Sequence, residues 1–317
     1  MKTFLTLFFV YLLAPSVSAK LVSKLSSQLN DYNLNISSQY NIAVFSRSEA
    51  HFKNATIWQV AIAKNGSFKT AHKLTLGPKQ YRYSDPMLSP DGQTLLFISD
   101  MPLASEYKRD DYNIWQASWS LGQWTNIHPL SSVNSEADEL SPEIHNGSLY
   151  FSSTRSGKLS LYQIDIVNKS SKVTPYKAIQ HKRLSQSDLT FSPDGNIALY
   201  WQLSEDRKDS ILMMQQRTSE GWGLPKMMHN RVQSIAFEFT PQFSPDGQWL
   251  YISSARKTDD YQHLNIHKFP TKEIFPHAWY KNNLGKVELD VLANRKQIKS
   301  IKTFEYDLNI KQGNSLN

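Results

Sequence analysis

Short apolar runs separated by polar turns repeat along most of this chain. Residues 95–99 read Leu-Leu-Phe-Ile-Ser, and a second run at 114–117 follows after a polar loop. Runs of this length, rich in β-branched and aromatic residues, predict β-strands. The region from about residue 40 to about residue 270 is therefore expected to consist of short strands, while weak helical spacing over 20–32 predicts one short helix.

One turn sequence recurs at a regular spacing. Ser-Pro-Asp-Gly stands at 89–92, 192–195 and 244–247, so its last two copies are 52 residues apart. A worn copy with an Asn-Gly pair stands at 146–147. Proline fixes φ, aspartate bonds its own backbone, and glycine supplies the positive φ that closes a hairpin. Each copy thus predicts a hairpin, and a third strand and a weaker, edge-like fourth strand follow it before the next copy.

Four short strands repeated about every 50 residues predict an all-β chain folded as a β-propeller of four-stranded blades. Four clear repeats and a degenerate first copy at 42–60 give five blades. Two further strands are expected within 286–306, as a final partial blade that a strand near 34–37 completes. We expect six blades, with five as the alternative.

The longest apolar run lies at the start of the chain. Lys2 precedes the ten residues 4–13, and small residues follow up to Ala19. This arrangement predicts a signal peptide over 1–19 that is cleaved after Ala19. The run is too short to span a hydrocarbon core of ~30 Å. We expect residues 20–317 to form one propeller domain without a membrane span.

The pattern at 85–99, Asp-Pro-x-Leu-Ser-Pro-Asp-Gly-x-x-Leu-x-Phe-x-Ser, resembles the propeller repeat of the TolB family, periplasmic proteins of the Tol–Pal system. The same repeat forms the propeller of prolyl oligopeptidase-like enzymes. The resemblance covers roughly residues 40–270 and implies a propeller, usually of six blades. Since binding proteins and enzymes share the repeat, the resemblance does not select a function. The N-terminal α/β domain of TolB is not expected here, because about 20 residues separate Ala19 from the first repeat.

The composition limits which chemistry and which cellular compartment are expected for the chain. The chain has no cysteine, which excludes a disulfide framework, a thiolate metal site and a thiol nucleophile. An exported chain of this kind fits the periplasm, with secretion as the second choice. Loss of Lys2 with the signal peptide leaves 34 Lys and Arg against 28 Asp and Glu, a net charge of +6. A balance this mild, in an exported chain, argues against a nucleic-acid partner.

Catalytic signatures are missing from the sequence. It contains no Gly-x-Ser-x-Gly elbow, no phosphate-binding loop, no dinucleotide glycine pattern and no His-Glu-x-x-His motif. We expect no cofactor and no metal.

A binding surface is expected on one face of the propeller. Alternating strands place the Ser-Pro-Asp-Gly turns on one face and the variable, charged loops on the other, where binding residues usually lie. Acids near the starts of the inner strands, with arginines of these loops, form the candidate site at the channel mouth. These residues are Asp85, Asp138, Glu139, Asp188, Glu238, Arg155 and Arg256.

Two interpretations of these acids stay open. They form an acidic funnel for a cation or a basic partner segment, or they bond neighbouring backbone N–H groups and position the blades. The first predicted function is a non-catalytic, monomeric propeller that binds a protein, a peptide or a cell-envelope component through its loop-rich face. The alternative is a glycan lyase or hydrolase that uses the acids of the channel mouth. The enzyme requires convergent acids with His or Arg in a closed pocket and a bound divalent cation. The binding protein requires a broad, open face without strongly perturbed titrating groups.

Overall fold

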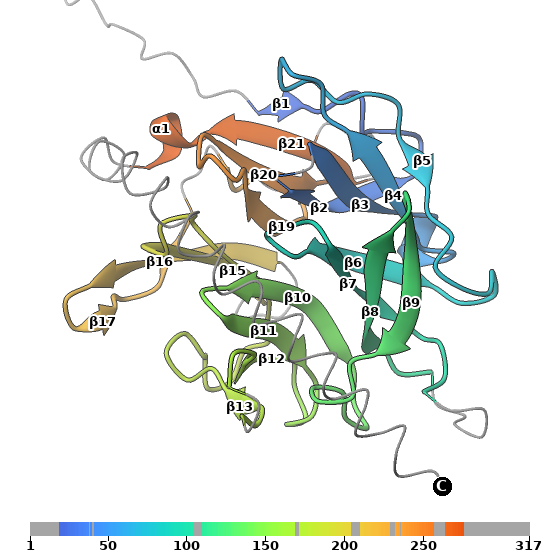
Figure 1. Ribbon diagram of the computed structural model, residues 1–317. Helices are drawn as coiled ribbons and strands as arrows, with labels where there is room; N and C mark the ends of the chain where they lie inside the picture. Colours follow the sequence, from blue (N-terminus) through green and yellow to red (C-terminus); the bar gives the residue numbers. More distant parts are fainter. Residues whose placement is uncertain are drawn as a thin grey trace, which may run out of the picture.

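The computed structural model is a β-propeller whose blades lie around a central axis (Figure 1). The structure describes residues 19–37, 39, 41–103, 110–168, 171–203, 210–228, 232–234, 236–256 and 264–275. The predicted all-β propeller is confirmed. Residues 1–18 of the predicted signal peptide and the strands expected at 286–306 lie outside the described residues, so the division of the chain at residue 19 stays a prediction.

Each blade is an antiparallel sheet whose first strand lies innermost, next to the channel. The first blade contains β2 (Asn30–Ser37), β3 (Ile42–Ser48), β4 (Thr56–Ala61) and β5 (His72–Lys73), and the second contains β6 (Tyr83–Leu88), β7 (Thr94–Ser99), β8 (Asn113–Ser120) and β9 (Gln123–Pro129). The third contains β10 (Glu139–His145), β11 (Ser148–Ser153), β12 (Ser160–Asp165) and β13 (Thr174–Pro175). The fourth contains β14 (Gln186–Phe191), β15 (Ile197–Leu203), β16 (Ser210–Thr218), β17 (Gly221–Trp222) and β18 (Lys226–Met227), and the fifth contains β19 (Glu238–Phe243), β20 (Trp249–Ser254), β21 (Asn265–Pro270) and β1 (Lys20–Leu21). The described helical segments are η1 (Ala50–Phe52) and α1 (Thr271–Ile274).

The Ser-Pro-Asp-Gly turns are held by their own side chains. In the first copy, Ser89 Oγ donates to Asp91 Oδ1 at 2.6 Å and accepts from Thr94 N at 2.9 Å. Gly92 has a φ of +62°, a value that favours glycine. The other two copies repeat these bonds, and the worn copy is an Asn-Gly turn with both residues at positive φ. The predicted hairpins are therefore confirmed.

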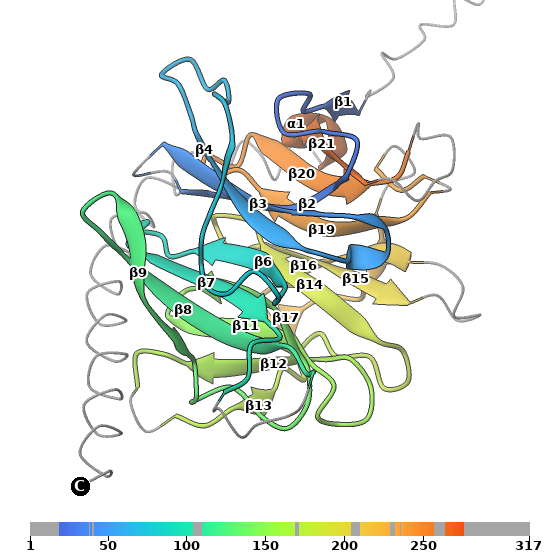
Figure 2. The same ribbon diagram turned by 90° about the vertical axis from the view of Figure 1, so that its right-hand side faces the viewer.

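The described residues form five blades that close into a ring. The innermost strands β2, β6, β10, β14 and β19 contact one another in cyclic order, with β19 beside β2 (Figure 2). The outermost strand of the fifth blade is the N-terminal β1, which pairs with β21. A segment from the start of the chain thus completes the last described blade and joins the two ends of the ring.

Two expectations about the chain ends are wrong. Six blades were preferred, but direct contact between β2 and β19 leaves no place for another blade between them. Residues 34–37 belong to β2, the innermost strand of the first blade, and do not complete a sixth. The region 20–32 forms β1, a turn and the start of β2 in place of a helix. Its apolar residues Val22 and Leu25 are instead buried in the core between the first and fifth blades.

Large apolar side chains fill the space between neighbouring blades. Phe45, Phe97, Phe151 and Tyr200 occupy matching positions on the second strands and are fully buried. Burial of such a side chain contributes roughly 1.5–3 kcal/mol. The repeated core makes the blades a rigid frame for whatever side chains face the channel. No helix within the described ranges is long and apolar enough to cross a membrane.

Candidate functional site

The same irregularity interrupts every innermost strand. In each blade the pairing with the second strand shifts register midway, and one residue of the break has positive φ. A bulge of this kind bends a strand and redirects a side chain. The five residues, called here the channel ring, line the cavities on both sides of the break. They are Asn33, Asp85, Ser141, Asp188 and Thr240.

Hydrogen bonds join the channel ring from blade to blade. Asn33 Nδ2 donates to Asp85 Oδ1, and Ser141 N and Oγ donate to Asp85 Oδ2 at 3.0 and 3.2 Å. Ser141 Oγ also lies 2.6 Å from Asp188 Oδ1, and Thr240 N donates to Asp188 Oδ2 at 3.0 Å. Asn33 N lies 3.4 Å from Thr240 Oγ1, which closes the circle. The ring therefore forms a polar septum across the channel, held by contacts from all five blades.

Burial raises the pKa values of the two aspartates. Desolvation and the nearby charge of Asp188, against hydrogen bonds from Ser84 and Ser141, together raise the pKa of Asp85 to about 6. Desolvation also raises the pKa of Asp188, against hydrogen bonds from Ser141, Thr240 and Ser187 that lower it. The binding hypothesis predicted no strongly perturbed titrating group at the site, and the raised pKa values of Asp85 and Asp188 do not meet that prediction.

On the loop-rich side of the ring lies an open cavity of about 430 Å³, called here the funnel. Its floor is the channel ring, and its walls are the starts of the inner strands and nearby loops. This volume is within the range of small-molecule sites. Its remaining wall includes Arg82, Tyr112 and Trp201.

One side of the funnel is aromatic. Tyr32, Phe52, Phe239 and Phe237 form a chain of ring contacts with centroids 5.2, 6.1 and 6.0 Å apart, called here the aromatic wall. Phe52 and Phe237 remain 42% and 43% exposed. Phe52 and the preceding His51 have φ of +56° and +57°. Consecutive non-glycine residues in this conformation are strained, and such strain clusters at functional sites.

On the turn side of the ring lies a pit of about 40 Å³. Glu143 lines it and is 7% exposed. Thr190 Oγ1 donates to Glu143 Oε1 at 3.0 Å, but desolvation dominates and raises the pKa of Glu143 to about 8. Glu143 is therefore protonated at neutral pH. The channel thus has a wide, aromatic side and a narrow side, with the ring between them.

The structure does not bring all the predicted site residues together. Asp85 and Asp188 line the channel, as expected, but Glu139 and Glu238 line neither cavity and are fully buried. Arg155 Nη2 lies 2.8 Å from Glu139 Oε1, and Arg256 Nη2 lies 2.9 Å from Glu238 Oε1. The predicted placement of these two pairs at the channel mouth is therefore wrong.

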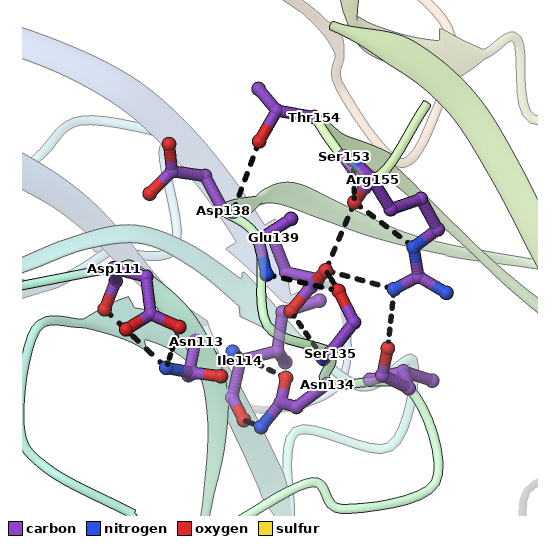
Figure 3. A network of polar contacts seen from close by, with 12 residues as sticks. Asp111, Asn113, Ile114, Asn134, Ser135, Asp138, Glu139, Ser153, Thr154 and Arg155 are labelled. Atoms are coloured by element: carbon purple, nitrogen blue, oxygen red, sulfur yellow. Dashed lines mark hydrogen bonds and ion pairs between the residues drawn. The ribbon is translucent and has the colours of Figure 1, made fainter. Parts of the chain in front are cut away.

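The pairs instead fix the loop that enters each blade, as Figure 3 shows for Glu139. Ser135 donates to the Glu139 carboxylate from its backbone N and its Oγ, at 2.8 and 2.6 Å, and Arg155 Nη2 donates to the carbonyl of Val133 at 2.6 Å. The same arrangement, called here the arginine clamp, recurs in three blades, in the pairs Asp31–Arg47, Glu139–Arg155 and Glu238–Arg256.

Asp138 also has a positioning role. Its Oδ1 accepts from Tyr112 N at 3.0 Å. Its own N donates to Thr154 Oγ1 at 3.1 Å, as Figure 3 shows. Asp138 lines neither cavity, although Tyr112 lines the funnel. Within the part of the chain that the structure describes, no three His, Asp or Glu side chains are placed to hold a metal ion.

No protein-family model matches the chain, and no curated protein matches its sequence. Among solved structures, the chain is similar to TolB from Acinetobacter baumannii, with 16% identity over 78% of this chain and 56% of that chain and a TM-score of 0.45. It is also similar to a putative TolB from Agrobacterium tumefaciens, with 13% identity over 75% of this chain and 76% of that chain and a TM-score of 0.47.

Prolyl oligopeptidase B from Galerina marginata is similar too, with 11% identity over 77% of this chain and 32% of that chain and a TM-score of 0.43. The chain therefore spans about half of the Acinetobacter TolB and about a third of the oligopeptidase. The likeness lies in the propeller fold, which both groups share with this chain.

Proposed function

We propose that this chain is a non-catalytic propeller that binds a protein or a cell-envelope component through the funnel on its loop-rich face. The observation that carries the proposal is the aromatic wall, which leaves two phenylalanines more than 40% exposed beside an open cavity. Aromatic side chains contribute large contact areas and are enriched in protein interfaces. Their position over a rigid ring of blades gives a partner a preformed surface.

The channel ring favours binding over catalysis. The carboxylate oxygens of Asp85 and Asp188 accept hydrogen bonds from neighbouring ring residues, so the two acids are held within a network that spans all five blades. Such a network positions groups for recognition, whereas a general acid or base must exchange its proton with a substrate. The raised pKa values follow from burial in this ring.

The compartment follows from the sequence. The signal peptide predicted over 1–19 and the lack of cysteine both support an exported protein that works in the periplasm. A partner is therefore expected among periplasmic proteins or envelope components.

Affinity capture from a periplasmic extract tests this proposal. The wild type is compared with the double variant Phe52→Ser/Phe237→Ser and with Leu224→Ser, whose apolar side chain is 85% exposed but does not line the funnel. We expect one partner to be recovered with the wild type and Leu224→Ser, and at least tenfold less with the double variant. Equal recovery with all three folded proteins would contradict a funnel site.

A further inference from the structure

The acidic residues of the inner strands fall into two groups. Three of them are neutralised by an arginine clamp. Among the described residues, no Lys or Arg forms an ion pair with Asp85 or Asp188. Every donor that reaches these two carboxylates within the ring is an uncharged amide or hydroxyl group. The floor of the funnel therefore carries negative charge that the described chain does not neutralise.

The other charged groups of the funnel do not change this balance. Arg82 lines the wall, but its Nε lies 2.8 Å from Asp100 Oδ2, and its guanidinium stacks over Tyr112 at 4.6 Å. His51 is the other basic residue of the lining, and no lysine is among the lining residues that the structure describes. Among the lining residues that the structure describes, the funnel floor thus presents an excess of negative charge to a ligand.

The hydrogen bonds indicate which aspartate has capacity for a ligand. Ser141 Oγ carries one proton and lies nearer to Asp188 Oδ1, at 2.6 Å, than to Asp85 Oδ2, at 3.2 Å. Asp85 then accepts three hydrogen bonds, from Asn33 Nδ2, Ser84 Oγ and Ser141 N. Asp188 accepts two, from Ser141 Oγ and Thr240 N, because the single proton of Ser187 Oγ lies nearer to Ser152 Oγ, at 3.0 Å, than to Asp188 Oδ1, at 3.2 Å. Because an ionised carboxylate offers about four acceptor positions, Asp188 has more free positions than Asp85.

We propose that the funnel binds an organic ammonium group on an apolar stem, with the ammonium at Asp188 and the stem along the aromatic wall. This inference rests on the proposed function and adds the chemistry of its ligand. Aromatic faces attract organic cations and cover apolar stems, so the wall and the acidic floor select the same kind of ligand. The ammonium belongs either to a free amine or to a lysine or N-terminus of a peptide.

Calorimetry with matched probes tests the inference. The full chain is titrated at pH 7.5 with phenethylamine and with 2-phenylethanol, which has the same shape without the charge. A capped Ala-Phe-Lys-Ala peptide and its norleucine counterpart form the second pair. We expect the cationic member of at least one pair to bind at least tenfold more tightly than its neutral counterpart. Preference within the first pair alone identifies a free amine, and preference within the second alone identifies a peptide.

Two variants locate the effect. Asp188→Asn is expected to abolish the preference for the charged probe, and Glu143→Gln, on the turn side of the ring, is expected to keep it. Should Asp188→Asn fail to fold, Phe237→Ala provides a second test, because it should weaken both members of a pair by several fold. Equal binding of charged and neutral probes in both pairs, or an unchanged preference in folded Asp188→Asn, overturns the inference.

A failure of this inference can be distinguished from a failure of the proposed function. If the charged probes show no preference while the Phe52→Ser/Phe237→Ser protein still loses its partner, the ligand chemistry is wrong and the funnel remains the binding site. If that double variant keeps its partner, the proposed function itself fails.

Discussion

Glu143 is a buried acid that no described arginine pairs with. Burial raises its pKa from the ordinary 4.5 to about 8. The folded protein therefore keeps this proton over a pH range in which the unfolded chain has lost it. The stability that the raised pKa confers is fully present below about pH 4.5 and is lost as the pH rises through 8.

Glu143→Gln is expected to remove this pH dependence, because the amide is a neutral replacement of similar shape. At pH 5 the variant should unfold close to the wild type. At pH 9 its free energy of unfolding should exceed that of the wild type by on the order of a few kcal/mol. Denaturant unfolding at both pH values measures this, with the exposed Glu220→Gln as the matched control. Parallel pH profiles for wild type and Glu143→Gln would contradict the assignment.

Only part of the channel ring was predictable from single residues. Asp85 and Asp188 stand at the same place before a Ser-Pro-Asp-Gly turn, so the repeat reveals them. Asn33, Ser141 and Thr240 occupy the same place in the other blades but share no side-chain chemistry, and a search for acids misses them. Their common feature is a backbone conformation, for which Asn is the only favourable residue among the three.

The arginine clamp acts between secondary-structure elements, because it ties the loop that enters a blade to the inner hairpin of that blade. Arg155→Ala is expected to destabilise the protein by about 3–5 kcal/mol, because the buried Glu139 carboxylate loses its partner. Arg82→Ala should cost at most about 1 kcal/mol, since the Arg82 side chain is 35% exposed in its pair with Asp100. Thermal unfolding of the two variants compares them. Similar losses would show that the clamp has no special role.

The candidate site residues include two of the three clamps, but not Asp31–Arg47, and the channel-mouth position predicted for them is wrong. Glu139 and Glu238 stand at the starts of inner strands, and Arg155 and Arg256 start the following loops, as a channel-mouth site requires. Glu139 and Glu238, however, stand two residues before the bulge residues Ser141 and Thr240, and this position places each carboxylate beside the loop that enters its own blade. This placement depends on the shift in strand pairing within β10 and β19, and the pattern of apolar and polar residues does not reveal that shift.

At the scale of the whole molecule, the ring depends on its N-terminal segment. Leu25 is fully buried in a core that both the first and the fifth blades contribute to, whereas Leu21 is 50% exposed in β1. Leu25→Ala is expected to cost about 2–5 kcal/mol and Leu21→Ala less than about 0.5 kcal/mol. Hydrogen exchange should show loss of protection in β1, β2 and β21 of Leu25→Ala first. Uniform loss across all blades would contradict this view of the closure.

The fold was predictable because each repeat of four strands contains a recognisable turn sequence. The number of blades was not, because β1 has only two residues and pairs with a strand more than 240 positions away. The aromatic wall was hidden for a similar reason, since Tyr32, Phe52, Phe237 and Phe239 come from opposite ends of the described chain. Their proximity is a result of closing the ring.

Site-specific photo-crosslinking in the living cell tests most directly whether the funnel is the binding face. A benzophenone amino acid replaces Phe237 on the aromatic wall or, in the matched control, the exposed Asp246 in a Ser-Pro-Asp-Gly turn. We predict one discrete crosslinked adduct from position 237 and none from position 246. An adduct from position 246 alone, or the same adducts from both positions, would contradict the account.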